Sequence, residues 1–140
     1  MDAAAALPFD QLDFIYTPSK DVAKDLEFFS GVLGGHVVFA IDGMGTRVAA
    51  IRLASSPPLI LLADHLEGDR PILVYRVPDL NAALESLVER GWQREQSFEI
   101  PHGPCCSFSS PGSSPGEHRI ALYQLARPEA AAHFEGRRDF

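Results

Sequence analysis

The sequence lacks the features that mark several large functional classes. It carries 12 Lys and Arg residues against 19 Asp and Glu, a formal net charge of -7, and shows no basic cluster beyond Arg137-Arg138. This balance argues against a surface that binds nucleic-acid phosphates. Apolar runs such as residues 57–63 are far too short to cross a bilayer, and the N-terminus has no basic residue of the kind that opens a signal peptide. We therefore expect a cytoplasmic protein without nucleic-acid or membrane partners.

Cysteine is also scarce, and the common catalytic motifs are missing. The only two cysteines, Cys105 and Cys106, are adjacent. A vicinal pair cannot link distant segments in the way that the disulfides of secreted proteins do. The sequence contains no Walker loop, no Rossmann glycine pattern and no Gly-x-Ser-x-Gly elbow. Function has to be sought in the fold rather than in a local motif.

The most informative feature that is present is an internal repeat. Residues 21–29 and 79–87 match in register at an offset of 58 (79 − 21), with acidic, aliphatic, Leu-Glu and apolar positions coinciding. A duplicated fold tends to bind its ligand between the two equivalent halves. At 140 residues and 46% hydrophobic, the chain has the size of one domain. We expect a single domain, 1–140, with modules at about 11–66 and 70–126 and a tail at 127–140.

Each module is predicted to contain a strand, a helix and three further strands. Alternating and β-branched apolar segments predict strands at 12–17, 36–41, 46–53, 59–63, 72–77, 92–100, 105–109 and 119–125. Asp21 and Asp79 are the expected N-caps of the two helices. The first helix should present a single apolar stripe of Val22, Leu26, Phe29 and Leu33. Residues 110–116 are expected to form a loop, and 130–134 one or two helical turns.

The tandem βαβββ pattern resembles the glyoxalase, bleomycin-resistance and extradiol-dioxygenase group, also called the vicinal oxygen chelate superfamily. The resemblance covers residues 12 to 125 and rests on the duplication, on Phe28-Phe29-Ser30-Gly31-Val32-Leu33-Gly34 closing the first helix and on Asp79-Leu80 opening the second. It implies an α+β fold in which tandem βαβββ modules form a curled, eight-stranded mixed sheet. Members bind small molecules in the cup of this sheet, often with a divalent metal.

The resemblance also locates the family's metal-ligand positions, and here they are apolar. Counting back seven residues from each helix N-cap gives Phe14 and Ile72, and the two glutamate positions of the family fall at about Leu61 and at Ala121. Divalent metals need oxygen, nitrogen or thiolate donors, which none of these side chains provides. We therefore predict no metal in this site and no other cofactor.

Strand alternation extends the candidate ligand site to polar residues. If Phe14, Ile72 and Ala121 face the cup, then Leu12, Val74 and four polar side chains share their faces. Tyrosines and arginines around an apolar floor would suit a planar ligand that carries a carboxylate or carbonyl. The alternative is that the arginines lie in water at strand ends and the tyrosines pack in the core. The predicted ligand-binding residues are Phe14, Tyr16, Leu61, Ile72, Arg76, Arg119, Ala121 and Tyr123.

Catalytic candidates are few. Cys105 could act as a nucleophile with His102 as its base, and Tyr123 is a further acid-base candidate. Because successive strand residues point to opposite faces, only one of the two cysteines can reach the cup. The alternative is that both cysteines are small buried hydrophobic residues beside a turn.

Three functions follow from these patterns. The first is metal-free binding of an aromatic or carbonyl-bearing molecule, similar to sequestration by bleomycin-resistance proteins. The second is a related lyase, isomerase or oxygenase with a non-standard active site, and the third is a regulatory or structural protein with a filled cavity. A homodimer is expected because each module leaves an open sheet edge. In the tail, Phe134 and Phe140 could dock on a neighbouring surface, but a frayed terminus is the default expectation.

Overall fold

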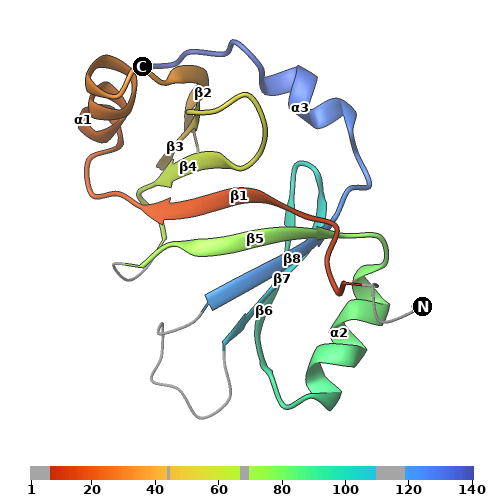
Figure 1. The fold of residues 1–140 in the computed structure, drawn as a ribbon. Coiled ribbons are helices and arrows are strands. Elements are labelled where there is room, and N and C mark those ends of the chain that lie inside the picture. The colour runs from red at the N-terminus through yellow and green to blue at the C-terminus, as the bar shows by residue number, and fades with distance from the viewer. Residues whose placement is uncertain (1–6, 44, 67–69, 110–118) are drawn as a thin grey trace.

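One mixed sheet of eight strands organises the chain. The computed structural model describes residues 7–43, 45–66, 70–109 and 119–140 (Figure 1), so the predicted loop at 110–116 lies outside the described residues. The strand order is β2-β3-β4-β1-β5-β8-β7-β6. The strands are β1 (Gln11–Pro18), β2 (His36–Gly43), β3 (Thr46–Arg52), β4 (Leu59–Ala63), β5 (Ile72–Val77), β6 (Gln93–Ile100), β7 (Gly103–Ser109) and β8 (Arg119–Gln124).

The strand order confirms the tandem βαβββ architecture. Each module supplies four adjacent strands, and the modules join through the antiparallel pair β1–β5, while β1–β4 and β5–β8 are parallel. The sheet is less curled than the cup that the sequence led us to expect. Its two edge strands, β2 and β6, stand at opposite ends of the order, and the sheet twists along its length without closing (Figure 1).

Both module helices begin at the aspartates that the repeat identifies. Helix α1 (Val22–Glu27) follows Asp21, whose carboxylate accepts a hydrogen bond from the Lys24 backbone N–H. Helix α2 (Leu80–Glu89) follows Asp79, which accepts from the Ala82 N–H in the same way. These caps satisfy backbone donors that have no partner in the first helical turn. The internal repeat therefore corresponds to two equivalent helix N-termini.

The first helix departs from the predicted single stripe. It continues into a π-helical segment, η2 (Phe28–Val32), in which the Leu33 N–H donates to the Phe28 carbonyl. A π turn holds more residues than an α turn, so side chains beyond it rotate away from the buried face. Val22 and Leu26 are buried as predicted, whereas Leu33 is 51% exposed. The prediction that Leu33 continues the buried stripe is wrong.

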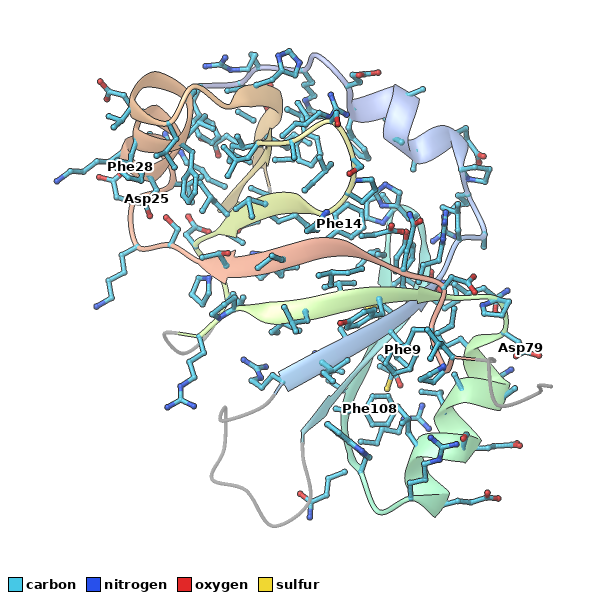
Figure 2. The ribbon with its side chains drawn as sticks, in the orientation of Figure 1. Phe9, Phe14, Asp25, Phe28, Asp79 and Phe108 are labelled. Carbon is cyan, nitrogen blue, oxygen red and sulfur yellow. The ribbon has the colours of Figure 1, made fainter. Side chains whose placement is uncertain are left out.

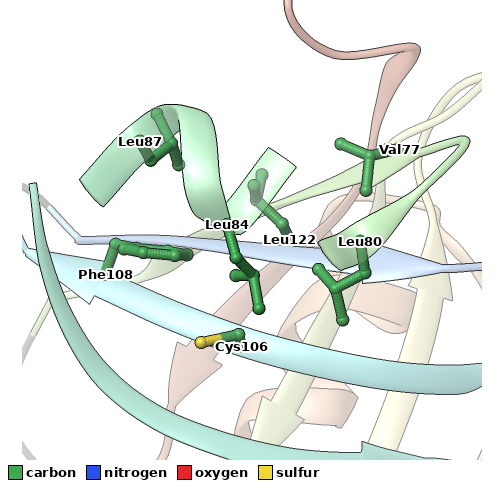
Figure 3. Packing of buried hydrophobic residues seen from close by; sticks show 7 residues of the cluster. All are labelled: Val77, Leu80, Leu84, Leu87, Cys106, Phe108 and Leu122. Atoms are coloured by element: carbon green, nitrogen blue, oxygen red, sulfur yellow. The ribbon is translucent and has the colours of Figure 1, made fainter. Parts of the chain in front are cut away.

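The two module helices cover the same face of the sheet. Helix α2 buries Leu80, Leu84 and Leu87 against Cys106, Phe108 and Leu122 of β7 and β8 (Figure 3). Figure 2 shows Phe108 on the side of the sheet that faces α2. Helix α1 packs Val22 and Leu26 in the same manner on β3 and β4. The opposite face, which we call the site face, carries Phe14, Ile72, Val74, Ala121 and Tyr123 in a separate cluster.

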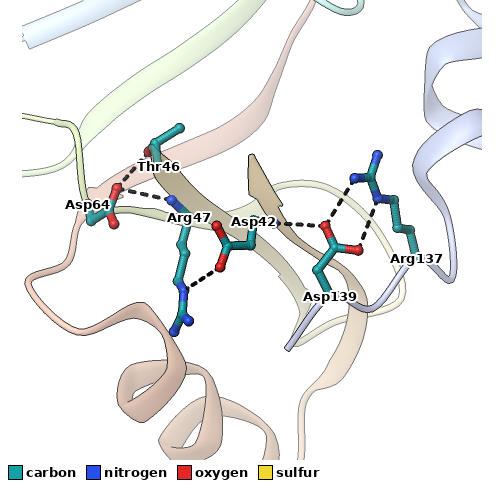
Figure 4. A network of polar contacts seen from close by, with 6 residues as sticks. All are labelled: Asp42, Thr46, Arg47, Asp64, Arg137 and Asp139. Carbon is teal, nitrogen blue, oxygen red and sulfur yellow. Dashed lines mark hydrogen bonds and ion pairs between the residues drawn. The ribbon is translucent and has the colours of Figure 1, made fainter. Parts of the chain in front are cut away.

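The tail lies against the edge of its own sheet. After helix α3 (Glu129–Phe134), the Gly136 N–H donates to the Val38 carbonyl, and the backbone of Ala40 bonds to Arg137 and Asp139. The Asp139 carboxylate accepts a further bond from the Asp42 N–H (Figure 4). These contacts cover the β2 edge, which corrects the expectation of a fraying tail. The expected homodimer stays a prediction, and no helix in the described ranges is long and apolar enough to cross a membrane.

Candidate functional site

The four positions aligned with the family's metal ligands meet on the site face. Phe14, Ile72 and Ala121 expose 8%, 6% and 2% of their surface within one buried cluster, and Leu61 packs against it. We call this set, together with Val74, the apolar floor. In the described part of the chain, no three His, Cys, Asp or Glu side chains are placed to hold a metal ion. The donor chemistry of the floor does not fit a divalent metal.

A bulge in β1 brings a residue onto the site face that the sequence analysis missed. Leu12 pairs with Tyr75 and Phe14 pairs with Val74, so Asp13 is an extra residue between two regular pairs. Tyr75 packs against the α2 cluster. Leu12 therefore lies on the face that the module helices cover, which we call the outer face, and not in the cup as expected. The Asp13 carboxylate occupies the position on the site face that was expected for Leu12. An acidic residue inside the apolar stretch 12–15 was the one signal of this arrangement.

Asp13 is the centre of a buried polar cluster. Its carboxylate accepts hydrogen bonds from the Tyr123 hydroxyl and from the Gln11 side-chain amide, and Arg76 Nε lies 3.7 Å from Asp13 Oδ2. Asp13 exposes 8% of its surface and Tyr123 only 2%. Burial raises the pKa of the Tyr123 phenol, and the hydrogen bond to Asp13 raises it further. Tyr123 is therefore a neutral donor to a buried carboxylate.

Arg76 borders this cluster with its donors available. Its side chain is 31% exposed, and it pairs with Gln11 on β1 and with Tyr123 on β8. Among the described residues, its guanidinium has the ion pair with Asp13 but no hydrogen bond to a protein acceptor. A guanidinium carries five N–H groups in a planar fork that matches a carboxylate. Arg76 can therefore donate to a bound carboxylate or carbonyl.

Tyr16 lies at the other end of the floor. It pairs with Ile72 and Leu61, and its hydroxyl oxygen is 3.2 Å from Nε2 of His65. Burial, followed by the proximity of Cys105, raises the pKa of Tyr16 to about 12. Arg119 belongs to this end as well, because its neighbour Ile120 pairs with Leu73. The predicted tyrosines and arginines thus divide into two groups at opposite ends of the floor.

Cys105 points to the site face and Cys106 to the α2 side. Burial raises the pKa of the Cys105 thiol to about 12, with a further increase from Cys106. The thiolate is the nucleophilic form of cysteine, so this environment keeps Cys105 unreactive at neutral pH. The structure supplies no support for Cys105 as a nucleophile.

His102 covers one side of the floor. It sits in the turn between β6 and β7, and its ring centroid lies 5.3 Å from that of Phe14 and 6.2 Å from that of Tyr123. Its carbonyl accepts hydrogen bonds from the backbone N–H groups of Ala126 and Arg127. The start of the tail therefore holds this turn, and with it the imidazole, over the floor.

The burial of His102 predicts a pH-dependent stability. Burial lowers the pKa of His102 from 6.5, although Asp13 opposes this shift. The unfolded chain therefore binds a proton at His102 more readily than the folded chain does. The contribution of this histidine to stability is complete above pH 6.5 and is lost as the pH falls through the lower pKa of the folded state. We expect urea midpoints to decrease from pH 7.5 toward pH 5 by less in His102→Asn than in the wild type. The matched substitution of exposed His133 should keep the wild-type slope, and identical slopes in all three proteins would contradict the prediction.

Comparison with solved structures finds similar proteins at low sequence identity. Methylmalonyl-CoA epimerase from Mycobacterium tuberculosis superposes with a TM-score of 0.69 at 21% identity, covering 93% of this chain and 99% of that one. A variant of the Streptomyces coelicolor methylmalonyl-CoA epimerase, in complex with 2-nitronate-propionyl-CoA, gives a TM-score of 0.66 at 13% identity, with coverages of 84% and 96%. TnmS3, an antibiotic-binding protein from Streptomyces sp. CB03234, gives 0.41 at 21% identity, with coverages of 86% and 100%.

These comparisons confirm the expected fold and leave the function open. The structural neighbours are members of the vicinal oxygen chelate superfamily, as the tandem βαβββ pattern predicted. At such identities the likeness concerns the fold alone. No family model matches the sequence, and no curated protein is similar to it.

Proposed function

We propose that this chain, which has the fold of the vicinal oxygen chelate superfamily, binds a small molecule on its site face without a metal ion. The ligand would be an aromatic or otherwise planar compound with a carboxylate or carbonyl group. Its role would be sequestration, as in the bleomycin-resistance proteins that the sequence resembles. Phe14, Ile72, Leu61 and Ala121 would contact the apolar body of the ligand.

The observation that supports this proposal concerns the hydrogen-bond donors of the Arg76 guanidinium. The Asp13 carboxylate beside it already accepts hydrogen bonds from Tyr123 and Gln11. Arg76 therefore stands at the border of the apolar floor, and among the described residues its guanidinium has the 3.7 Å ion pair with Asp13 but no hydrogen bond. Apolar surface next to an available multi-donor group is the composition of a site for an aromatic acid.

We expect a ligand to approach through the more exposed residues of the site face. Phe14, Ile72 and Ala121 are nearly inaccessible, whereas Tyr16 and Leu61 are only half-buried. A planar ligand would contact the floor first through these half-buried residues. It would then extend toward Arg76, which shares this intermediate exposure.

A substitution at Arg76 tests the proposed function. A thermal-shift screen of aromatic carboxylates should identify compounds that raise the melting temperature, since a ligand that binds only the folded state stabilises it. For such a compound, Arg76→Gln should weaken binding by about tenfold or more, the loss of a charge-assisted hydrogen bond. Arg90→Gln, which replaces an exposed arginine after α2, should bind like the wild type.

A chemical control separates recognition of the ligand from the stability of the fold. The carboxamide analogue of the same compound should bind more weakly to the wild type, and Arg76→Gln should reduce the preference for the carboxylate. Equal affinities for carboxylate and carboxamide in the wild type would contradict the role of Arg76. No stabilisation by any aromatic carboxylate would contradict the proposed function.

A further inference from the structure

A chain of hydrogen bonds extends from the Tyr16 end of the site face to the exposed end of β4. Tyr16 Oη lies 3.2 Å from His65 Nε2, and His65 Nδ1 lies 2.9 Å from Thr46 Oγ1. Thr46 Oγ1 in turn lies 2.6 Å from Asp64 Oδ1, which also accepts from the Arg47 backbone N–H (Figure 4). The four side chains come from β1, the start of β3 and the residues after β4. Each contact has hydrogen-bond length.

The chemistry of these groups determines which one donates in each bond. The hydrogen bonds from Thr46 and from the Arg47 backbone lower the pKa of Asp64, so its carboxylate is ionised and can only accept. The single hydroxyl proton of Thr46 therefore points to Asp64. Its contact with His65 then uses a proton on His65 Nδ1, and in the tautomer that carries its one proton there, Nε2 is an acceptor.

The hydroxyl proton of Tyr16 is consequently used in its bond to His65. Its proton donates to His65 Nε2, and burial keeps the phenol protonated by raising its pKa to about 12. The oxygen of Tyr16 retains lone pairs but has no second proton. Toward a molecule on the apolar floor, Tyr16 can act only as a hydrogen-bond acceptor.

We infer that the ligand carries a hydroxyl group at the Tyr16 end and a carboxylate at the Arg76 end, with an apolar aromatic body between them. This inference rests on the proposed function and narrows it to hydroxyaryl carboxylic acids. These two side chains select different groups, because the guanidinium of Arg76 can only donate and the oxygen of Tyr16 can only accept. A ligand that reversed the two groups would place a carboxylate, which has no proton, against the Tyr16 oxygen.

The spacing of the two ends gives the size of the aromatic body. Tyr16 pairs with Ile72, and Arg76 stands four residues further along β5. At about 3.3 Å per residue, these positions are roughly 13 Å apart along the strand. Two directly linked rings fit this distance better than one. A suitable probe is 4′-hydroxybiphenyl-4-carboxylate, and its 4′-methoxy analogue lacks the hydroxyl proton.

Isothermal titration calorimetry of the two probes tests the inference at pH 8, where an ordinary histidine is neutral. The wild type should bind the hydroxy compound about tenfold more tightly than the methoxy compound, the worth of one hydrogen bond that would otherwise be lost. Tyr16→Phe should bring this ratio close to one. Tyr75→Phe, a tyrosine on the outer face, should keep the wild-type ratio.

A third variant examines the hydrogen-bond chain itself. Thr46→Val keeps the shape of the side chain but removes the acceptor for His65 Nδ1, so the imidazole is free to carry its proton on Nε2. Nε2 would then donate to Tyr16 and release the tyrosine proton toward the ligand. The preference for the hydroxy compound should decrease in Thr46→Val even though Tyr16 is intact.

The outcomes separate this inference from the proposed function. If both probes bind the wild type equally, or if Tyr16→Phe keeps the preference, the inference is wrong while binding of aromatic carboxylates stands. If neither probe binds, the proposed function fails and the inference fails with it. A preference that disappears in Tyr16→Phe, weakens in Thr46→Val and persists in Tyr75→Phe supports the assignment.

Discussion

Gly103→Ala is expected to lower the free energy of unfolding by about 3–5 kcal/mol, among the largest effects of a single substitution. Gly103 opens β7 with a φ of +156°, and a Cβ atom built there would lie 1.9 Å from the Gln124 carbonyl oxygen and 3.0 Å from the Ala126 nitrogen. Both atoms are backbone, so a rotamer change cannot relieve the clash. The β6–β7 turn would have to move away from the end of β8, and the bonds to the His102 carbonyl would break.

Gly31→Ala is the matched control. Gly31 lies in η2, and a Cβ atom there meets nothing within 4 Å. Its substitution should change the stability by no more than about 1 kcal/mol. Urea unfolding of the two variants measures the difference directly. Similar urea midpoints for the two variants would contradict the prediction, because they would show that the β6–β7 turn can move away from the end of β8 at little cost in stability.

Tyr123→Phe is expected to cost about 1–3 kcal/mol, the penalty of leaving a buried polar group without its partner. The substitution removes only the hydroxyl that donates to Asp13, and the aromatic ring that packs on Phe14 remains. The Asp13 carboxylate would keep Gln11 and the more distant Arg76 as partners. Tyr75→Phe, in a half-buried position on the outer face, should change the stability by less than about 0.5 kcal/mol.

A double-mutant cycle identifies the source of this loss. In an Asp13→Asn background the buried group is neutral, so the Tyr123→Phe substitution should cost clearly less than in the wild type. Urea unfolding of the four proteins gives the coupling energy between the two side chains. Strictly additive effects would mean that the hydroxyl and the carboxylate stabilise the fold independently, against the contact described here.

Local patterns were sufficient to predict most of the strands and the starts of both module helices. The strands Leu59–Ala63 and Ile72–Val77 begin and end where alternation and turn residues predicted. Asp21 and Asp79 cap their helices as the repeat implied. Such features depend on residues within one or two turns of the chain, so a sequence expresses them directly.

The candidate site was predictable only in part. The apolar residues at the family's metal positions do meet on one face, because regular alternation carries them there. Asp13 was not predicted, since a bulge exchanges it with Leu12 and depends on how β1 pairs with β5. The hydrogen bond between Tyr16 and His65 joins residues that are 49 positions apart, and neither local sequence predicts it.

The sequence by itself determined the duplicated architecture and the apolar character of the site, because both are sums of local preferences repeated in two halves. Only the tertiary structure decided which polar groups border that site and which partners they contact. The bulge at Asp13 and the tail along β2 each depend on contacts between distant segments. Those contacts select among local conformations of similar energy, and their outcome is set by the packing of the whole sheet.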